Sequence, residues 1–167
     1  MRRLLACLGG QAHSQLESMV DASWQQQQTP GLAVALQPGA PCEGTFFRSP
    51  DFGCSGVVAG EIFNLGNLLS PYPSALEYQQ RIGLLMQDLH AKHGDEFALA
   101  FDGSYAIVMV SEDRSITVRD AIGERPLYVL QDDAGFVLAD TVAPLLCRSS
   151  RSLHAGGVSD FLATGFC

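Results

Sequence analysis

The stretch RDAIGERPLY, Arg119 to Tyr128, joins a charged pair to a glycine and then to a proline that precedes an apolar dipeptide. Glycine and proline favour tight turns, so the stretch is predicted to be the end of one strand, a turn and the start of the next strand. On the simplest interpretation, Arg119 and Asp120 form a surface ion pair worth about 0–1 kcal/mol, and Tyr128 is a core aromatic residue. The neighbouring segments have to be compared with known patterns to tell whether this stretch has a function beyond joining two strands.

Two predicted hairpins flank this stretch, because apolar or alternating runs are separated there by polar turn residues. They join strands at 105–110 and 116–119, and strands at 127–130 and 136–139, across turns at 111–114 and 132–135. Thr141 is predicted to cap a short helix, residues 148–157 to form a loop, and residues 158–163 to form a last helix.

The N-terminal half is predicted to mix strands and helices. Residues 3–8 are predicted to form a short buried strand. Between residues 31 and 59, the short apolar runs GLAVALQ, GTFFRS and SGVVA suggest a meander of strands. Residues 11–28 are predicted to be a helix with a solvated end at the glutamines 25–28, and residues 75–93 a helix that Gly94 stops. The sequence therefore predicts an α+β domain with two mostly antiparallel sheets and helices outside.

Composition limits the possible partners and compartments. The chain has 167 residues, 47% of them hydrophobic, and a net charge of -8, which fits one domain that binds neither nucleic acid nor an anionic membrane. No apolar run reaches the roughly 18 residues of a membrane span. Five cysteines without a CxxC pair fit a reduced cytoplasmic protein, and the apolar stretch before Cys7 is too short for a signal peptide.

RDAIGERPLY resembles the RDxxGxxPLY segment of the glutamine amidotransferase domain of asparagine synthetases, within the N-terminal nucleophile hydrolase group. A second match is AGEIFN at 59–64, which is similar to the family's NGEIYN-like segment. The other segments of the family correspond, in the same order, to 7–10, 74–77, 103–106 and 139–141. The resemblance covers nearly the whole chain and implies an αββα sandwich of two antiparallel sheets flanked by helices.

The resemblance also implies a glutaminase centre. In the family a first-residue Cys attacks the glutamine amide, and its free α-amino group is the base. Cys7 corresponds to that nucleophile, but only if residues 1–6 are removed; the other interpretation makes Cys7 a small apolar residue of a buried strand. Gly60 corresponds to the backbone N–H donor of the oxyanion hole. Glu61 either contacts an amino group in the pocket or is a solvated carboxylate.

Three polar groups of the family's site are replaced in this chain. Ala59 stands where the family has the oxyanion-hole Asn, and losing one such donor lowers the rate by about 10²–10³. Ala75 stands where an Asp holds the α-amino group of glutamine. The segment Gln28 to Gly31 lies where an Arg should grip the carboxylate, and it contains no Arg. These replacements predict a degenerate, inactive glutaminase site.

Two main hypotheses follow for function. The first is a scaffold or partner of an ATP-dependent, amide-forming synthetase, as in the degenerate N-terminal domains of β-lactam synthetase and lasso-peptide cyclase. The alternative is an active glutaminase that supplies ammonia for asparagine-type synthesis once residues 1–6 are removed. A third possibility is a separate binding domain that uses the residual pocket for another small molecule.

The expected organisation is one amidotransferase-like domain over residues 1–167, without its last strands and without a synthetase domain. No SGGxDS loop for ATP occurs in the chain, so ATP and Mg are expected only with the absent synthetase, and no cofactor or metal in this domain. The expected partners are a synthetase domain or chain, and a homodimer if a sheet edge is left open. Asn64 is predicted to bond to nearby backbone, and the four histidines to lie at the surface.

Overall fold

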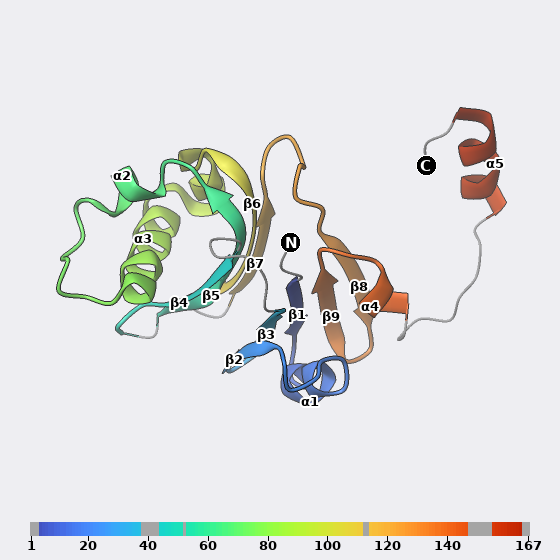
Figure 1. Ribbon diagram of the computed structural model, residues 1–167, viewed down its shortest axis with the longest axis horizontal. Coiled ribbons are helices and arrows are strands. Elements are labelled where there is room, and N and C mark those ends of the chain that lie inside the picture. Colours follow the sequence, from blue (N-terminus) through green and yellow to red (C-terminus); the bar gives the residue numbers. More distant parts are fainter. Residues whose placement is uncertain (1–3, 38–43, 52, 112–113, 147–154, 165–167) are drawn as a thin grey trace.

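The protein is a two-sheet sandwich with helices on both outer faces (Figure 1). This computed structural model describes residues 4–37, 44–51, 53–111, 114–146 and 155–164. Within these residues, neighbouring strands of both sheets pair in the antiparallel sense. The predicted αββα sandwich of the α+β class is therefore confirmed.

The first sheet, called sheet A, has five strands in the order β2-β3-β1-β9-β8. Its strands are β1 (Leu4–Leu8), β2 (Gln25–Thr29), β3 (Leu32–Leu36), β8 (Tyr128–Asp132) and β9 (Gly135–Ala139). The central strand β1 is apolar along its whole length, which allows it to be buried on both faces. Its register places Leu4 opposite Leu36 and Leu8 opposite Leu32.

The second sheet, sheet B, has four strands in the order β4-β5-β6-β7. They are β4 (Gly44–Arg48), β5 (Cys54–Ile62), β6 (Gly103–Ser111) and β7 (Arg114–Arg119). One face of sheet B meets sheet A in an apolar layer that includes Val57, Ala59 and Ala106 from sheet B and Leu4, Ala6 and Leu36 from sheet A. The core of the domain therefore lies between the sheets as well as beneath the helices.

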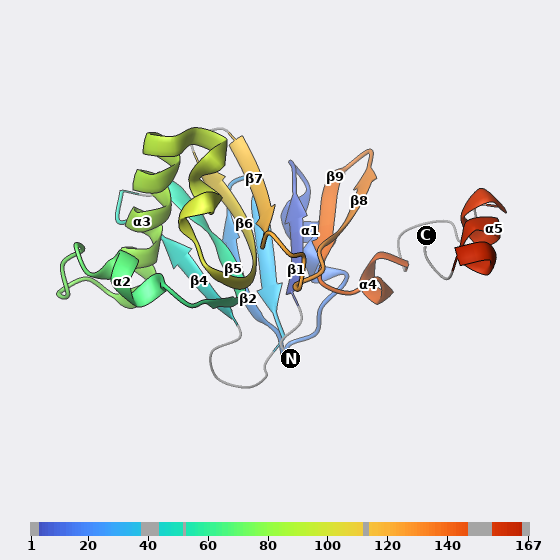
Figure 2. The same ribbon diagram turned by 90° about the horizontal axis from the view of Figure 1, so that it is seen from above.

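Helices form the outer layers, as Figure 2 shows from above. Sheet B is covered by α3 (Tyr78–His93) and by the 3-10 helix η1 (Gly94–Ala100), with α2 (Leu65–Leu69) beside them. Sheet A is covered by α1 (Ala12–Glu17) and α4 (Ala143–Leu146). The last helix, α5 (Ala155–Thr164), stands apart from the two-sheet body in both views.

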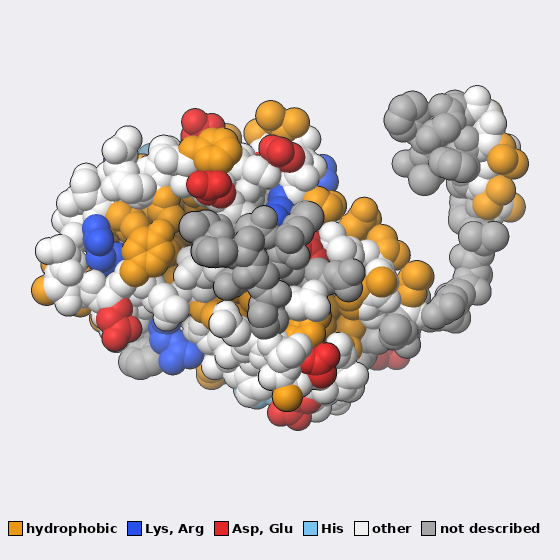
Figure 3. Space-filling model, in the orientation of Figure 1, with side chains coloured by type: hydrophobic (Ala, Val, Ile, Leu, Met, Phe, Trp, Pro, Cys, Tyr) orange, Lys and Arg blue, Asp and Glu red, His pale blue; other side chains and the backbone are white. Residues whose placement is uncertain are grey.

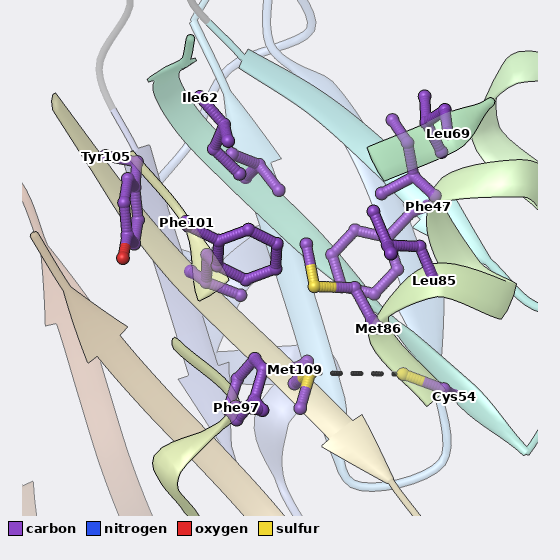
Figure 4. Packing of buried hydrophobic residues seen from close by; sticks show 13 residues of the cluster. Phe47, Cys54, Ile62, Leu69, Leu85, Met86, Phe97, Phe101, Tyr105 and Met109 are labelled. Carbon is purple, nitrogen blue, oxygen red and sulfur yellow. Dashed lines mark hydrogen bonds between the residues drawn. The ribbon is translucent and has the colours of Figure 1, made fainter. Parts of the chain in front are cut away.

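The layer between α3 and sheet B holds many of the largest buried side chains (Figure 4). Phe97 packs edge-on against Phe101, which packs edge-on against Tyr105, with ring centroids 6.0 and 5.8 Å apart. The Cys54 sulfur lies 3.9 Å from the Met109 sulfur in the same layer. Burial, with a smaller contribution from the Asp51 charge, raises the pKa of Cys54 to about 12, so this thiol stays protonated at neutral pH.

Two expectations about the N-terminal half are wrong. Residues 25–28 form most of strand β2, where Gln25 to Gln28 pair with the apolar strand β3. Helix α1 ends at Glu17 instead of continuing to Gln28. Glutamine is a good helix former, but helix propensity is a weak preference that tertiary contacts override, and here the run pairs with the apolar strand β3. The predicted meander is also divided, because β3 lies in sheet A whereas β4 and β5 lie in sheet B.

The other predicted elements agree with the structure apart from their ends and one cap. The expected cap is wrong, because α4 begins at Ala143 and the buried Thr141 hydroxyl makes no hydrogen bond to it. Both hairpins are present, β6–β7 and β8–β9, although residues 112 and 113 of the first turn lie outside the described residues. Helix α3 begins at Tyr78 and not at Ala75, because Glu77 and Gln80 form a capping box at its start. Of the predicted loop, residues 148–154 lie outside the description, and α5 already begins at Ala155.

Candidate functional site

The RDAIGERPLY stretch folds into a loop that is organised by one buried carboxylate. Asp120 Oδ1 accepts hydrogen bonds from the backbone N–H groups of Ile122 at 3.2 Å and Glu124 at 2.9 Å, and Oδ2 accepts one from Arg125 at 3.0 Å. Burial acts to raise the pKa of Asp120, but the backbone N–H donors from residues 122–125 together hold this pKa below its usual value. The Asp120 carboxylate is therefore ionised at neutral pH, and its role is to hold the backbone of the loop in place.

This geometry corrects the simplest interpretation of the stretch. Asp120 is buried and bonded to backbone N–H groups, so it is not half of a surface ion pair with Arg119. The Arg119 side chain lies over the turn instead, where a Cβ on Gly123 would come within 3.2 Å of its guanidinium carbon. Tyr128 is 43% exposed and does not belong to the core.

Arg125 connects the loop to the end of strand β9. Its Nη2 lies 3.8 Å from Asp140 Oδ2, and both side chains are buried. The Asp140 backbone N–H donates to Leu4 O at 3.3 Å, so the loop, the end of β9 and the start of β1 are joined at one end of sheet A. The sequence predicts a turn here, but it does not predict this ion pair, because nothing in the local pattern relates residue 125 to residue 140.

Gly60 lies near the end of β5, where β5 and β6 approach each other closely. Its φ is 95°, and a Cβ at this position would lie 2.2 Å from Ser104 O. Gly103, opposite Ile62, has the same relationship with Glu61 O, again at 2.2 Å. The two glycines are therefore required by the close approach of the strands, whatever the chemistry of the site.

A pocket of about 400 Å³ opens beside this strand end. Both predicted binding residues, Gly60 and Glu61, line the pocket, and Glu61 is exposed there. The wall is otherwise apolar or uncharged, and it is formed by Gly44, Thr45, Val58, Ile62, Leu65 and Tyr78. The sequence does not predict the contributions of Thr45 and Tyr78, because β4 and α3 come next to Gly60 only in the folded chain.

Cys7 lies away from this pocket. It is fully buried near the end of β1, between Ala33 of β3 and Val137 of β9. Its side chain belongs to the apolar layer between sheet A and the helices α1 and α4, together with Leu16 and Leu145. The structure therefore brings Gly60 and Glu61 together but does not bring Cys7 to them.

The residues before Cys7 are part of the sandwich. Leu4, Leu5 and Ala6 are each 0% exposed and form more than half of β1. They pair with Leu36, Ala35 and Val34 on one side, and Leu5 and Ala6 pair with β9 on the other. A first residue at position 7 would leave both neighbouring strands without most of their central partner.

Two of the replaced polar positions offer no contact to a ligand in the Gly60 pocket. Ala59 is fully buried in the layer between the sheets, in a cluster of alanine, valine and leucine side chains that includes Ala106. Ala75 is exposed in the turn before α3 and is not among the residues that line the Gly60 pocket. Neither side chain can form a hydrogen bond, so the pocket has no side-chain donor from these positions.

The segment expected to hold the carboxylate-binding Arg is at the other end of the sandwich. Gln28 and Thr29 belong to the end of β2. Thr29 Oγ1 lies 3.3 Å from Ser55 Oγ. Ser55 precedes Gly60 by five positions along β5, and a strand of that length spans roughly 17 Å. This segment is therefore too far from Gly60 to take part in the same pocket.

Asn64 and the histidines have structural environments. Asn64 Nδ2 donates to Ala100 O at 2.9 Å and its Oδ1 accepts from the Asp102 N–H at 3.1 Å, so the predicted backbone bonds exist but reach a distant segment. His13 and His93 are exposed, as predicted, whereas the side chain of His90 is only 13% exposed beside Phe97. His154 lies outside the described residues. Within the described part of the chain, no three His, Cys, Asp or Glu residues are placed to hold a metal ion.

The layered fold defines the class of protein, a domain with an N-terminal nucleophile hydrolase-like sandwich of two antiparallel sheets between helices. The sequence profile of a glutamine amidotransferase domain matches residues 45–147, well over half of the chain. The chain therefore belongs to the glutamine amidotransferase domain family. A comparison with curated proteins found no match. Within the described residues, no helix is both long enough and apolar enough to cross a membrane.

Among solved structures, the chain is similar to glutamine phosphoribosylpyrophosphate amidotransferase from B. subtilis, complexed with ADP and GMP. The TM-score is 0.54 and the sequence identity is 15%, with 86% of this chain and 36% of that chain covered. At this identity the likeness shows the fold alone. This chain thus spans about a third of the length of that structure.

Proposed function

We propose that this domain is an asparagine synthetase-like amidotransferase domain with a degenerate glutaminase site, which acts as a scaffold or partner for an ATP-dependent, amide-forming synthetase. The observation that carries the proposal is the position of Cys7 on the helix side of sheet A, while Gly60 and Glu61 line a pocket at the end of β5. A nucleophile and its oxyanion donor must both lie about 3 Å from one reacting atom. Cys7 and Gly60 belong to different layers.

The replacements at positions 59 and 75 support the same proposal. Ala59 has no side-chain donor for a tetrahedral intermediate, and Ala75 has no carboxylate for the amino group of glutamine. Hydrogen bonds to charged groups contribute about 1.5–3 kcal/mol each, so a pocket without them discriminates poorly in favour of glutamine. Glu61 is the one charged side chain among the described residues that line the pocket.

The alternative is an active glutaminase produced by removing residues 1–6, with Cys7 as nucleophile. Removing residues 1–6 would cost much stability, because Leu4, Leu5 and Ala6 are buried and paired with neighbouring strands. Replacing one buried Leu by Ala typically destabilises a protein by about 2–5 kcal/mol, which is a large share of a domain's total stability of roughly 5–15 kcal/mol. The truncated chain is therefore the less stable form.

Two measurements on the full chain test the proposal. Intact mass after expression is expected to show residues 1–6 in place, and incubation with glutamine is expected to give no glutamate above a no-protein blank. An active amidotransferase measured in parallel shows that the assay detects turnover. A chain that starts at Cys7 and releases glutamate, with the release lost in Cys7→Ala, would establish the alternative.

The synthetase partner is tested separately. It is expected to contain an SGGxDS loop, either in the reading frame that continues beyond residue 167 or in a neighbouring frame. Such a partner would supply the ATP and Mg chemistry, and it would work with this domain in a cytoplasmic, reducing setting that suits five cysteines without a paired motif. Absence of this loop from the neighbouring frames would favour a separate binding domain instead.

A further inference from the structure

Another pocket, here called the Arg48 pocket, lies at the end of the sandwich opposite Gly60. Its volume is about 410 Å³, and it opens between the turn that joins β2 to β3 and the ends of β4, β5 and β6. It is lined by Gln28, Thr29, Pro30, Arg48, Gly53, Ser55 and Val110. Pockets of about 300–1,000 Å³ hold small organic molecules, so this one has room for more than a single ion.

Strand register turns two polar side chains toward the Arg48 pocket. Arg48 of β4 lies opposite Ser55 of β5, and Ser55 lies opposite Val110 of β6. Phe46 and Val57, two positions away on the same strands, pack in the apolar layer between the sheets. Side chains alternate along a strand, so Arg48 and Ser55 face that same layer. A cation and a hydroxyl therefore stand where the layer would otherwise continue with apolar side chains.

Sheet A completes the polar wall. Arg48 Nη2 donates to Gln28 O at 3.4 Å, and Ser55 Oγ donates to Thr29 Oγ1 at 3.3 Å. Ser55 is only 7% exposed. A hydroxyl has one hydrogen, so Thr29, which accepts from Ser55, keeps its own hydrogen for a second partner. The Arg48 guanidinium and the Thr29 hydroxyl are therefore two different donors beside one pocket.

The charge of the Arg48 pocket is positive. Arg48 is the one charged side chain among the described residues that line it. Asp51, in the turn between β4 and β5, accepts from Gln87 Nε2 of α3 at 3.0 Å, on the helix side of sheet B. Arg48 also borders a neighbouring hollow with Glu77, whose carboxylate caps the start of α3. Both nearby carboxylates are therefore bonded to other groups of the protein.

We propose that the Arg48 pocket binds a small organic acid through its carboxylate, with Arg48 and Thr29 as donors and Pro30 and Val110 against its aliphatic part. The planar guanidinium fork matches the two oxygens of a carboxylate, and one guanidinium balances one negative charge. Basic side chains are scattered over the face drawn in Figure 3, and the net charge of -8 repels polyanions. A monocarboxylate therefore fits better than a phosphorylated ligand.

This site is independent of the function proposed for the Gly60 end of the domain. Ser55 and Gly60 lie five positions apart on β5, which spans roughly 17 Å. One small ligand cannot reach both pockets. Binding at the Arg48 pocket is thus measured without reference to glutamine or to a synthetase partner.

An NMR titration of the ¹⁵N-labelled full chain with sodium butyrate, at constant ionic strength set by sodium chloride, tests the proposal. Saturable shifts are expected at the backbone N–H groups of Thr29, Gly53 and Ser55. Butyramide, which has the same size without the charge, is expected to bind at least about tenfold more weakly, and inorganic phosphate more weakly than butyrate. Shifts that do not saturate, or that map to Gly60 and Glu61, overturn the site. Phosphate binding tighter than butyrate overturns the assignment to a carboxylate.

Three variants assign the binding to its residues. Arg48→Gln is expected to weaken butyrate binding at least about tenfold, and Thr29→Val, which keeps the side-chain shape, about two- to tenfold. Arg114→Gln is the matched control, because Arg114 is exposed on β7 and does not line the Arg48 pocket; it is expected to bind butyrate as the wild type does. Circular dichroism verifies that each variant folds, and Thr29→Val decides the outcome if Arg48→Gln does not. Variants at 48 or 29 that fold and bind butyrate as tightly as Arg114→Gln overturn the proposal.

Discussion

Cys7 and Ala59 pack in different hydrophobic layers on opposite faces of sheet A. Cys7 faces the helices α1 and α4, whereas Ala59 faces the layer between the two sheets. Side chains alternate along a strand, so Leu4, Ala6 and Leu8 share the Ala59 side while Leu5 and Cys7 point away from it. A one-residue shift of β1 would be needed to bring Cys7 to the inner face, and it would turn every apolar side chain of the strand over.

Removing residues 1–6 is expected to destabilise the domain rather than activate it. The deletion takes Leu4, Leu5 and Ala6 out of the central strand, and all three are fully buried. Thermal unfolding followed by circular dichroism is expected to show loss of the cooperative transition, and glutamate release is expected to stay at the blank. Removal of residues 1–3 alone is the control, because it leaves β1 whole. A deletion variant that folds and hydrolyses glutamine would contradict this prediction.

Gly60→Ala is expected to destabilise the protein, because a Cβ at a φ of 95° would be strained and would meet Ser104 O at 2.2 Å. Strain of this kind costs about 1–3 kcal/mol. Gly66→Ala is the matched control, since Gly66 lies in α2 and a Cβ added there would meet no atom within 4 Å. Ala there is expected to be neutral or to stabilise by up to about 1 kcal/mol. Urea unfolding midpoints of the two variants measure the difference, and equal midpoints would contradict the close approach of β5 and β6.

Breaking the buried Arg125–Asp140 pair from one side is expected to cost about 3–5 kcal/mol, since the remaining charge stays buried. Arg125→Ala and Asp140→Ala are each expected to lower the free energy of unfolding by this amount, and the Arg125→Met, Asp140→Leu double variant by much less. Urea denaturation of the three variants measures these losses.

Arg114→Ala is the control for the buried pair. Arg114 Nη1 lies 3.8 Å from Asp95 Oδ1, and both side chains are largely exposed. Loss of a surface pair of this kind is expected to cost at most about 1 kcal/mol. If the double variant loses as much free energy of unfolding as the two single variants together, residues 125 and 140 do not stabilise each other and the prediction is wrong.

Asp120 is expected to make the domain sensitive to acid. Its folded pKa is lowered, so its carboxylate stabilises the fold fully above the unfolded pKa of about 3.9. That stability is lost as the pH falls from about 4 through the folded pKa. Asp120→Asn is expected to be less stable at neutral pH and to lose less stability on acidification. The exposed Asp133→Asn is the control, and denaturation midpoints at several pH values below neutrality make the measurement. Parallel pH curves for wild type and Asp120→Asn would count against this role.

Local patterns predicted much of the fold. Apolar runs predicted β1, β3, β6 and β9 within a residue or two, and helical spacing predicted α3. The prediction was wrong at Gln25 to Gln28, because pairing with β3 overrides the weak helix propensity of glutamine. For the site, the pattern suggested Gly60 and Glu61, but it did not indicate the face on which Cys7 lies, the distance of Thr29 from Gly60, or the pairing of Arg125 with Asp140.

The sequence by itself determined the layers, because burial requires apolar side chains at fixed periods along each element and turn residues between elements. It also determined that Ala59 and Ala75 offer no polar side-chain group, since the chemical type of a side chain is known from the sequence without a structure. Only the tertiary structure decided which residues meet. The face on which Cys7 lies, the wall that Tyr78 gives to the Gly60 pocket and the meeting of Thr29 with the Arg48 pocket all follow from strand register and sheet order. Register depends on contacts between residues far apart in the chain, which no local pattern contains.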